Sequence, residues 1–213
     1  MASNLFSSKV ITMGTLIAVF LSTSDEMLPI MLSEQTSVLE LLKIVGFKVI
    51  VGIIIGFLVD LIYKRKDAKE SITEICEKEH CSCDEHGIVF SSIKHTLKIG
   101  LFILIANLLI NAVIFKVGED ALESILLNKN IFTYFIASLV GLIPNCASSV
   151  VLTEDYLSGL ISVGTLLSGL LTGSGLGILL LFKTNKNLKE NLLVLSIVYF
   201  VGVLIGLLVD IIL

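Results

Sequence analysis

Charged residues, proline and tryptophan are all scarce in this sequence of 213 residues. Charged side chains make up 16% of it, against roughly 25% in an ordinary soluble domain. There are only two prolines and no tryptophan, so an aromatic belt at the membrane interface must consist of Tyr and Phe. Apolar residues reach 55%, and the mean hydropathy is +0.98. One soluble core cannot hide that much apolar surface, so the composition excludes a soluble enzyme, a nucleic-acid binder and a disordered chain.

Long apolar runs indicate an all-α integral membrane protein. A helix needs about 20 apolar residues to cross a bilayer. Uninterrupted runs favour helices over a closed barrel, because every backbone polar group in lipid must be paired within the protein. About six segments reach this length or come close to it: Val10–Leu32, Leu41–Tyr63, Leu97–Phe115, Ile131–Leu152, Leu160–Phe182 and Leu192–Leu213.

Basic residues suggest an orientation in the plasma membrane. The run Lys64–Lys66 follows the second segment, which makes the hydrophilic loop 64–95 cytoplasmic by the positive-inside rule. Lys183, Lys186 and Lys189 conflict with this if all six segments cross. A reversed orientation or a re-entrant segment would explain the conflict.

The sequence repeats itself at an offset of 150 residues, where 8–63 aligns with 158–213 without a gap. The polar and glycine identities are Ser8/Ser158, Gly14/Gly164, Thr15/Thr165, Ser24/Ser174, Glu40/Glu190, Gly52/Gly202, Gly56/Gly206 and Asp60/Asp210. They predict an internal duplication, the common plan of secondary transporters. Six crossing segments would make the copies parallel, and a re-entrant hairpin between them would make them inverted.

The repeat divides the chain into three parts. These are a first, incomplete repeat (1–63), a hydrophilic loop (64–95) and a second repeat (96–213). Two apolar segments, within 97–157, precede the second copy, whereas only seven residues precede the first. We therefore expect a chain shortened at its N-terminus, or one that receives the missing helices from a second copy or an N-terminal fragment.

An acidic pair interrupts the first segment. Ser24, Asp25 and Glu26 lie deep within it, and Pro29 follows. An ionised side chain at this depth costs roughly 2.5–3.5 kcal/mol, and such residues mark ion or proton sites. Ser174 occupies the place that matches Ser24, but no acidic pair follows it. The functional interpretation is a cation or proton site, and the alternative is a loop between two half-segments.

A proline also interrupts the fourth segment. Pro144 is followed by a small polar run, which is typical of the discontinuous helices of transporters. The candidate pathway residues here are Asn145, Cys146, Ser148 and Ser149. The alternative is a kinked helix with a buried structural cysteine and serines bonded to their own helix. Glu154 ends this segment, either as a gate or cap of the pathway or as an interfacial residue.

The loop between the repeats is dense in thiol and imidazole groups. Its candidate metal ligands are Cys76, His80, Cys81, Cys83 and His86. A C-x-C pair suits a soft or borderline metal such as Zn or Cu, and Mn is a further possibility. The loop would then act as a sensor or delivery site, while transport itself requires no cofactor. The alternative is a solvated, charged linker.

Two motifs carry a resemblance to a known family. These are Thr-Ser-Asp-Glu-Met-Leu-Pro (23–29) and Leu-Ile-Pro-Asn-Cys-Ala-Ser-Ser-Val-Val-Leu-Thr-Glu (142–154). With them, the chain resembles the bacterial ten-transmembrane heavy-metal exporters, whose members are also labelled manganese transporters or arsenic efflux proteins. The resemblance covers nearly the whole chain and includes the Cys/His-rich loop. Family members carry a Pro-x-Cys segment upstream of the acidic pair, and this chain has none.

The leading hypothesis is therefore an integral membrane permease, not an enzyme, that exports a heavy-metal ion. Asp25 and Glu26 would coordinate the cation, and the backbone around Pro144 would complete the site. Carboxylates, amides and carbonyls favour Mn²⁺. The alternatives are an arsenical efflux permease and a non-transporting subunit with a metal-sensing loop. An intramembrane hydrolase lacks a second catalytic group at the same depth. The expected partners are the metal ion and the lipid bilayer, and no nucleic acid.

Overall fold

A computed structural model gives the arrangement of the chain. It describes residues 2–23, 27–63, 131–144, 146–185 and 187–212, together with scattered positions between 97 and 112. Within these residues every regular element is a helix, as the composition predicts. In chain order the helices are α1 (Ala2–Ser7), α2 (Met13–Ser22), α3 (Met27–Ser33), α4 (Val38–Ile62), α9 (Phe132–Gly141), α10 (Cys146–Leu157), α11 (Val163–Thr172), α12 (Leu176–Thr184) and α13 (Leu188–Ile212).

Four stretches of the described chain are long and apolar enough to cross a membrane. Two are the unbroken helices α4 and α13, and the other two, 13–33 and 163–184, are each made of two shorter helices. The expected segment 97–115 lies largely outside the described residues. Pro29 does not cause the first break, because α2 has already ended at Ser22 and Pro29 lies in the first turn of α3, where proline is tolerated.

Helix bounds recur at the 150-residue offset. α2 and α11 share their bounds after the shift, and so do α4 and α13. The same kind of N-cap begins α2 and α11: the Thr12 hydroxyl accepts from Thr15 N, and the Ser162 hydroxyl accepts from Thr165 N, both at 3.2 Å. The turn before each helix also matches, with a left-handed residue at Lys9 (φ 58°) and at the equivalent glycine (φ 75°).

An aspartate clamps the two helices of each unit together. Asp60, near the end of α4, accepts hydrogen bonds from Gly14 N (2.8 Å) and the Thr12 hydroxyl (2.5 Å). Asp210, near the end of α13, accepts from Gly164 N (2.8 Å) and the Ser162 hydroxyl. Each carboxylate thus lies at the positive, N-terminal end of the neighbouring helix, where the helix dipole stabilises it.

Glycine makes this close approach possible. A Cβ at Gly14 would lie 2.0 Å from the Gly56 carbonyl oxygen, and a Cβ at Gly164 would lie 2.2 Å from the Gly206 carbonyl oxygen. Any side chain at these positions would force the two helices apart.

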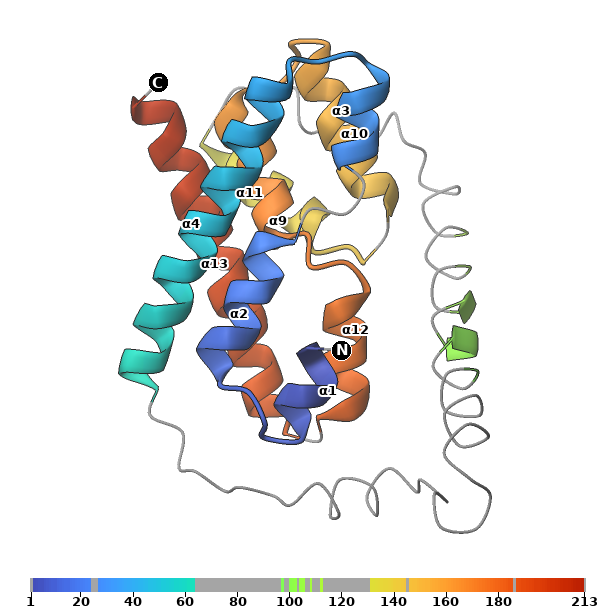
Figure 1. The fold of residues 1–213 in the computed structure, drawn as a ribbon, viewed down its shortest axis with the longest axis vertical. Helices are drawn as coiled ribbons and strands as arrows, with labels where there is room; N and C mark the ends of the chain where they lie inside the picture. Colours follow the sequence, from blue (N-terminus) through green and yellow to red (C-terminus); the bar gives the residue numbers. More distant parts are fainter. Residues whose placement is uncertain are drawn as a thin grey trace.

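The two units run in opposite directions. In Figure 1, α4 descends from the upper end to the lower end, whereas α13 ascends to the C-terminus. α1 and α12 lie together at the lower end, and α3 and α10 lie together at the upper end. The contacts agree, since Ser3 and Ser7 of α1 donate to the carbonyls of Gly177 and Thr184, each at 2.8 Å.

The expected span 131–152 is instead part of a hairpin of two short helices. α9 runs parallel to α11, because Ser168 Oγ donates to Tyr134 O (2.8 Å) and Thr172 Oγ1, four residues on, donates to Ser138 O (3.0 Å). α10 runs antiparallel to α11, to which a short turn connects it. Ten residues of α9 rise about 15 Å, half of the hydrocarbon thickness of about 30 Å. The hairpin of α9 and α10 therefore enters the bilayer and leaves it on the same side.

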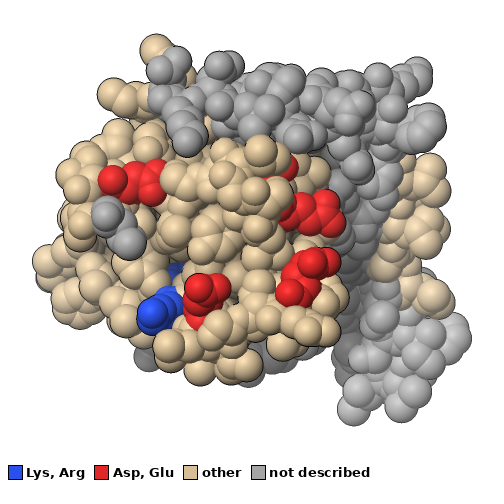
Figure 2. All heavy atoms as spheres, turned by 90° about the horizontal axis from the view of Figure 1, so that it is seen from above, with Lys and Arg blue, Asp and Glu red and all other residues tan. Residues whose placement is uncertain are grey.

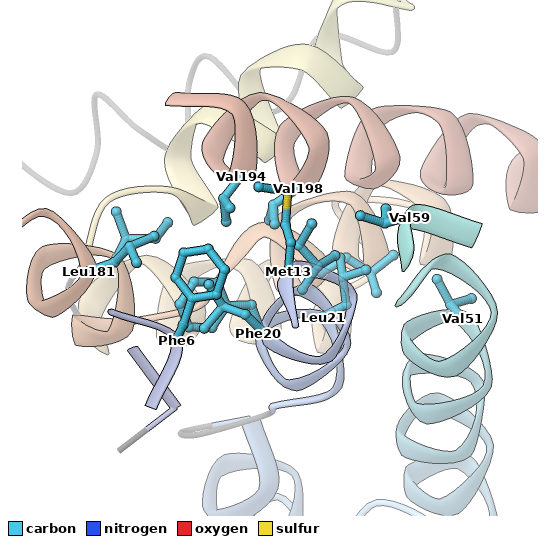
Figure 3. Close-up of a cluster of buried hydrophobic side chains, with 13 residues drawn as sticks. Phe6, Met13, Phe20, Leu21, Val51, Val59, Leu181, Val194 and Val198 are labelled. Carbon is cyan, nitrogen blue, oxygen red and sulfur yellow. The ribbon is translucent and has the colours of Figure 1, made fainter. Parts of the chain in front are cut away.

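The apolar core consists of two clusters, one toward each end of the bundle. The lower cluster, shown in Figure 3, packs side chains of α1, α2, α4, α11, α12 and α13, among them Phe6, Phe20 and Leu181. The upper cluster joins α3, α9, α10 and α11. Between them lies the level at which the helices are broken.

Candidate ion pathway

Three helix breaks occur near the middle of the bundle. They lie after Ser22, after Gly141 and after Thr172. The second and third meet directly, because a Cβ at Gly173 would lie 3.8 Å from the Gly141 carbonyl oxygen. Broken helices at the membrane midplane supply backbone carbonyls and helix ends to transported ions.

A lysine connects the first and third breaks. Lys48, in the middle of α4, is 1% exposed, and its ammonium donates to the carbonyl oxygens of Thr23 and Leu170 (2.9 Å for the latter). Thr23 directly follows α2, and Leu170 lies in the last turn of α11. One buried cation therefore joins the two oppositely directed units.

The break in α11 explains why Leu170 accepts from a side chain. In a continuous helix its carbonyl would accept from Ser174 N, but that N–H donates to Thr172 O instead (2.8 Å). The two carbonyls that accept from Lys48 thus lie at helix C-terminal ends, where the backbone dipole is negative and a cation is stabilised.

Ser174 places a further oxygen at the third break. Its side chain is 7% exposed, and its hydroxyl oxygen has no hydrogen-bond partner among the residues that the structure describes. An unpaired buried hydroxyl is costly, so it is a candidate oxygen donor to an ion. This is the residue that the repeat pairs with Ser24.

The tip of the hairpin is formed by Pro144. α9 ends three residues before it, and the proline has no N–H to continue the helical ladder. Ser148 is 3% exposed, with its hydroxyl donating to Ile143 O (3.3 Å), while Ser149 is half-buried and accepts from the Thr153 hydroxyl at its carbonyl (2.7 Å). Both serines lie in the first turn of α10.

Several predicted site residues lie outside the described part of the chain. These are Ser24, Asp25, Glu26 and Asn145, together with the loop residues Cys76, His80, Cys81, Cys83 and His86. The backbone of Cys146 begins α10. Among the described residues no group of three His, Cys, Asp or Glu side chains is placed to hold a metal.

Glu154 lies far along α10 from the tip and is exposed at the upper end. Figure 2 views this end from above and shows more Asp and Glu than Lys or Arg. Lys9 and Lys183 lie at the opposite end, beside the start of α2 and at the end of α12. Lys64–Lys66 directly follow α4, which ends there.

Lys48 was not among the residues predicted from the sequence. The available signal was a lone ionisable residue in the middle of a 25-residue apolar helix, which by default indicates a functional group. Comparison with the second unit strengthens that signal, since the equivalent residue is Val198, fully buried and apolar.

Comparison with known families identifies the C-terminal half of this architecture. A family model described as "Putative, 10TM heavy-metal exporter" matches residues 108–213, which include the hairpin, the third break and α13. The chain belongs to this family. The same family was expected from the motifs at 23–29 and 142–154, and its exporter description supports metal transport in general. No curated protein and no solved structure matches the chain.

Proposed function

We propose that this exporter-family chain moves a divalent metal cation, Mn²⁺ in the first instance, through the level at which its helices break. The observation that carries the proposal is the convergence of two oppositely directed helix C-terminal ends on one buried cation, the Lys48 ammonium. Backbone carbonyls in such a place are ligands that transporters offer to cations.

The oxygen-rich composition of the centre favours a hard ion. The described donors are the carbonyls of Thr23 and Leu170 and the unpaired hydroxyl of Ser174. We propose that Asp25 and Glu26, which follow Thr23 in the chain, add the carboxylates, and that the segment from Pro144 to Cys146 completes the site. Oxygen donors prefer Mn²⁺ to thiophilic species, so arsenical efflux is the alternative rather than the first choice.

The arrangement of the units supports a rocking mechanism. We propose that 8–63 and 158–213 are an inverted duplication, because the helix bounds and the aspartate clamps recur at one offset while the helices run in opposite directions. In transporters built this way, one repeat moves against the other around a fixed central site.

Charge at the two ends supports one orientation. Three described segments lie at the lower end of Figure 1: the turn with Lys9 before α2, the end of α4, and the end of α12 with Lys183. If the hairpin of α9 and α10 does not cross the membrane, Lys183 no longer conflicts with the positive-inside rule. By the positive-inside rule we place this end in the cytoplasm and the acidic upper end outside the plasma membrane. Export would then carry the ion from the lower end to the upper end.

The test is metal transport by the full chain reconstituted in vesicles. Vesicles loaded with Mn²⁺, Zn²⁺, Cd²⁺ or arsenite would be assayed for protein-dependent release, with protein-free vesicles as the control. Mn²⁺ release above the other ions supports the proposal, and arsenite release above Mn²⁺ favours the alternative. Release of no ion would favour a non-transporting subunit.

A further inference from the structure

A carrier that exports an ion must also return without it. When the ion leaves, the oxygen atoms that held it stay at the middle of the membrane, where no lipid group can donate a hydrogen bond to them. An unpaired buried carbonyl costs as much as a lost hydrogen bond or more. The ion-free centre therefore needs a donor of its own.

Lys48 has the geometry for that task. Its ammonium donates to one carbonyl from each unit, Thr23 O of the first and Leu170 O of the second (2.9 Å). Both carbonyls lie where a helix has ended, and within the described residues no backbone N–H donates to them. The side chain is 1% exposed, which makes it part of the centre rather than of the surface.

We infer that Lys48 is the resident cation of the ion-free state, and that it lets the carrier return empty after each export step. The inference rests on the proposed function. When a metal ion enters, its double charge repels the ammonium, and the side chain withdraws from the carbonyls. When the ion leaves, the ammonium returns to them. No proton needs to be gained or lost in this exchange.

The comparison between the units supports one such cation rather than two. Val198 takes the place of Lys48 in the second unit and is fully buried in the lower core cluster. In the first unit, the carbonyl of Phe20, which matches Leu170, accepts from the Thr23 hydroxyl (3.0 Å). The carbonyl of Leu170 has Lys48 as its donor, and Gly173 stands in the place of Thr23.

Net efflux and exchange separate this role from a purely structural one. Vesicles containing the full chain would be loaded with radioactive Mn²⁺, and release would be measured into metal-free medium and into medium with unlabelled Mn²⁺. Net efflux requires the ion-free centre to reorient, whereas exchange does not. We expect Lys48→Met to lose net efflux and to keep exchange, and Lys48→Arg, which keeps a donor cation, to retain net efflux. Lys43→Met, at an exposed position of the same helix, is the matched control.

The outcomes are distinct. Equal loss of both fluxes in Lys48→Met, with Lys48→Arg normal in both, would assign the residue to the fold and overturn the inference. Unchanged fluxes in Lys48→Met would overturn it as well. Should Lys48→Met fail to assemble, Lys48→Gln, whose amide still donates one hydrogen bond, is expected to reduce net efflux more than exchange, and equal fluxes would again count against the inference. A wild-type chain that moves Mn²⁺ in neither assay contradicts the proposed function itself.

Discussion

The two units of this protein share their framework and differ at their centre. Both have a capped helix, a clamping aspartate near the end of a 25-residue helix and glycines at the crossing. At the break, however, the first unit has an acidic pair and Lys48, where the second unit has Gly175, Leu176 and Val198. The shared residues, the clamping aspartates included, hold helices against one another, whereas the ionisable residues near the break are not shared. The framework is thus present twice, and the ionisable groups near the break are present once.

The largest effect is expected from removing the charge that only the first unit carries. Asp25→Asn with Glu26→Gln should abolish metal transport, because neutral amides bind a divalent cation far more weakly than carboxylates do. Membrane abundance should stay normal, since the double variant is easier to insert. Transport would be measured as vesicle release and as resistance of cells to the metal. Glu34→Gln, exposed after α3, is the control. Full resistance in the double variant would mean that the asymmetry between the units has no role in transport.

By contrast, a substitution at the glycine crossing, which both units share, should destabilise the protein in either unit. Gly14→Ala and Gly164→Ala each place a Cβ near 2 Å from a carbonyl oxygen of the neighbouring helix (2.0 and 2.2 Å). Each should lower the free energy of unfolding by roughly 1–3 kcal/mol, measured in detergent by denaturant titration. Gly46→Ala, within the long helix α4, has open space around it and serves as the control. A loss in only one unit would show that the crossings are not equivalent.

The clamps provide a finer comparison, because within the described residues Asp210 accepts one hydrogen bond more than Asp60. The Tyr134 hydroxyl also donates to Asp210 (2.8 Å), and α9 has no described counterpart in the first unit. We expect Asp210→Asn to be more destabilising than Asp60→Asn, and Tyr134→Phe to cost roughly 0.5–1.5 kcal/mol on its own. Thermal unfolding of the purified variants would give the order. In an Asp210→Asn background, Tyr134→Phe should have a smaller effect, and equal effects in both backgrounds would contradict the shared hydrogen bond.

The smallest effect on transport is expected outside both units. Replacing Cys76, Cys81 and Cys83 by Ser should leave vesicle transport unchanged, because the loop is proposed to sense or deliver metal. The same change should abolish retention of Zn²⁺ by the purified full chain at neutral pH, where binding is expected to release protons. Unchanged Zn²⁺ retention would leave the loop a charged linker, and lost transport would place it on the pathway.

The sequence predicted the helical framework well, because it is set by apolar length and glycine spacing. The four spanning stretches, with ends within four residues of those observed, the helix break near Pro144 and the exporter family were found from local patterns. The hairpin of α9 and α10 was not predicted. An apolar run of 22 residues has the same sequence pattern whether it crosses the membrane or folds back on itself. The turn depends on tertiary contacts, such as that of Thr172 with Ser138 (3.0 Å), which no local pattern reveals.

The central site was predicted only in part. Pro144 and Ser174 were named because a proline and a repeated serine are visible in a one-dimensional sequence. The structure places both beside helix breaks, and their part in transport stays a prediction. Lys48 was missed, because its role comes from carbonyls 25 and 122 residues away. Asp25 and Glu26 remain predictions. A sequence reveals unusual residues in apolar surroundings, but it does not reveal which backbone carbonyls lose their helical hydrogen bond at a break.

The docking of α1 on α12 has a consequence for the order in which the protein is made. Ser3 and Ser7 bond to backbone carbonyls 174 and 177 residues later in the chain. At roughly 5–20 residues per second, the ribosome needs on the order of 10–30 s to supply that partner. α2 and α4 are made long before α12, so α1 has no docking partner while they leave the ribosome. A truncation before residue 184 would leave the hydroxyl of Ser7 without its acceptor.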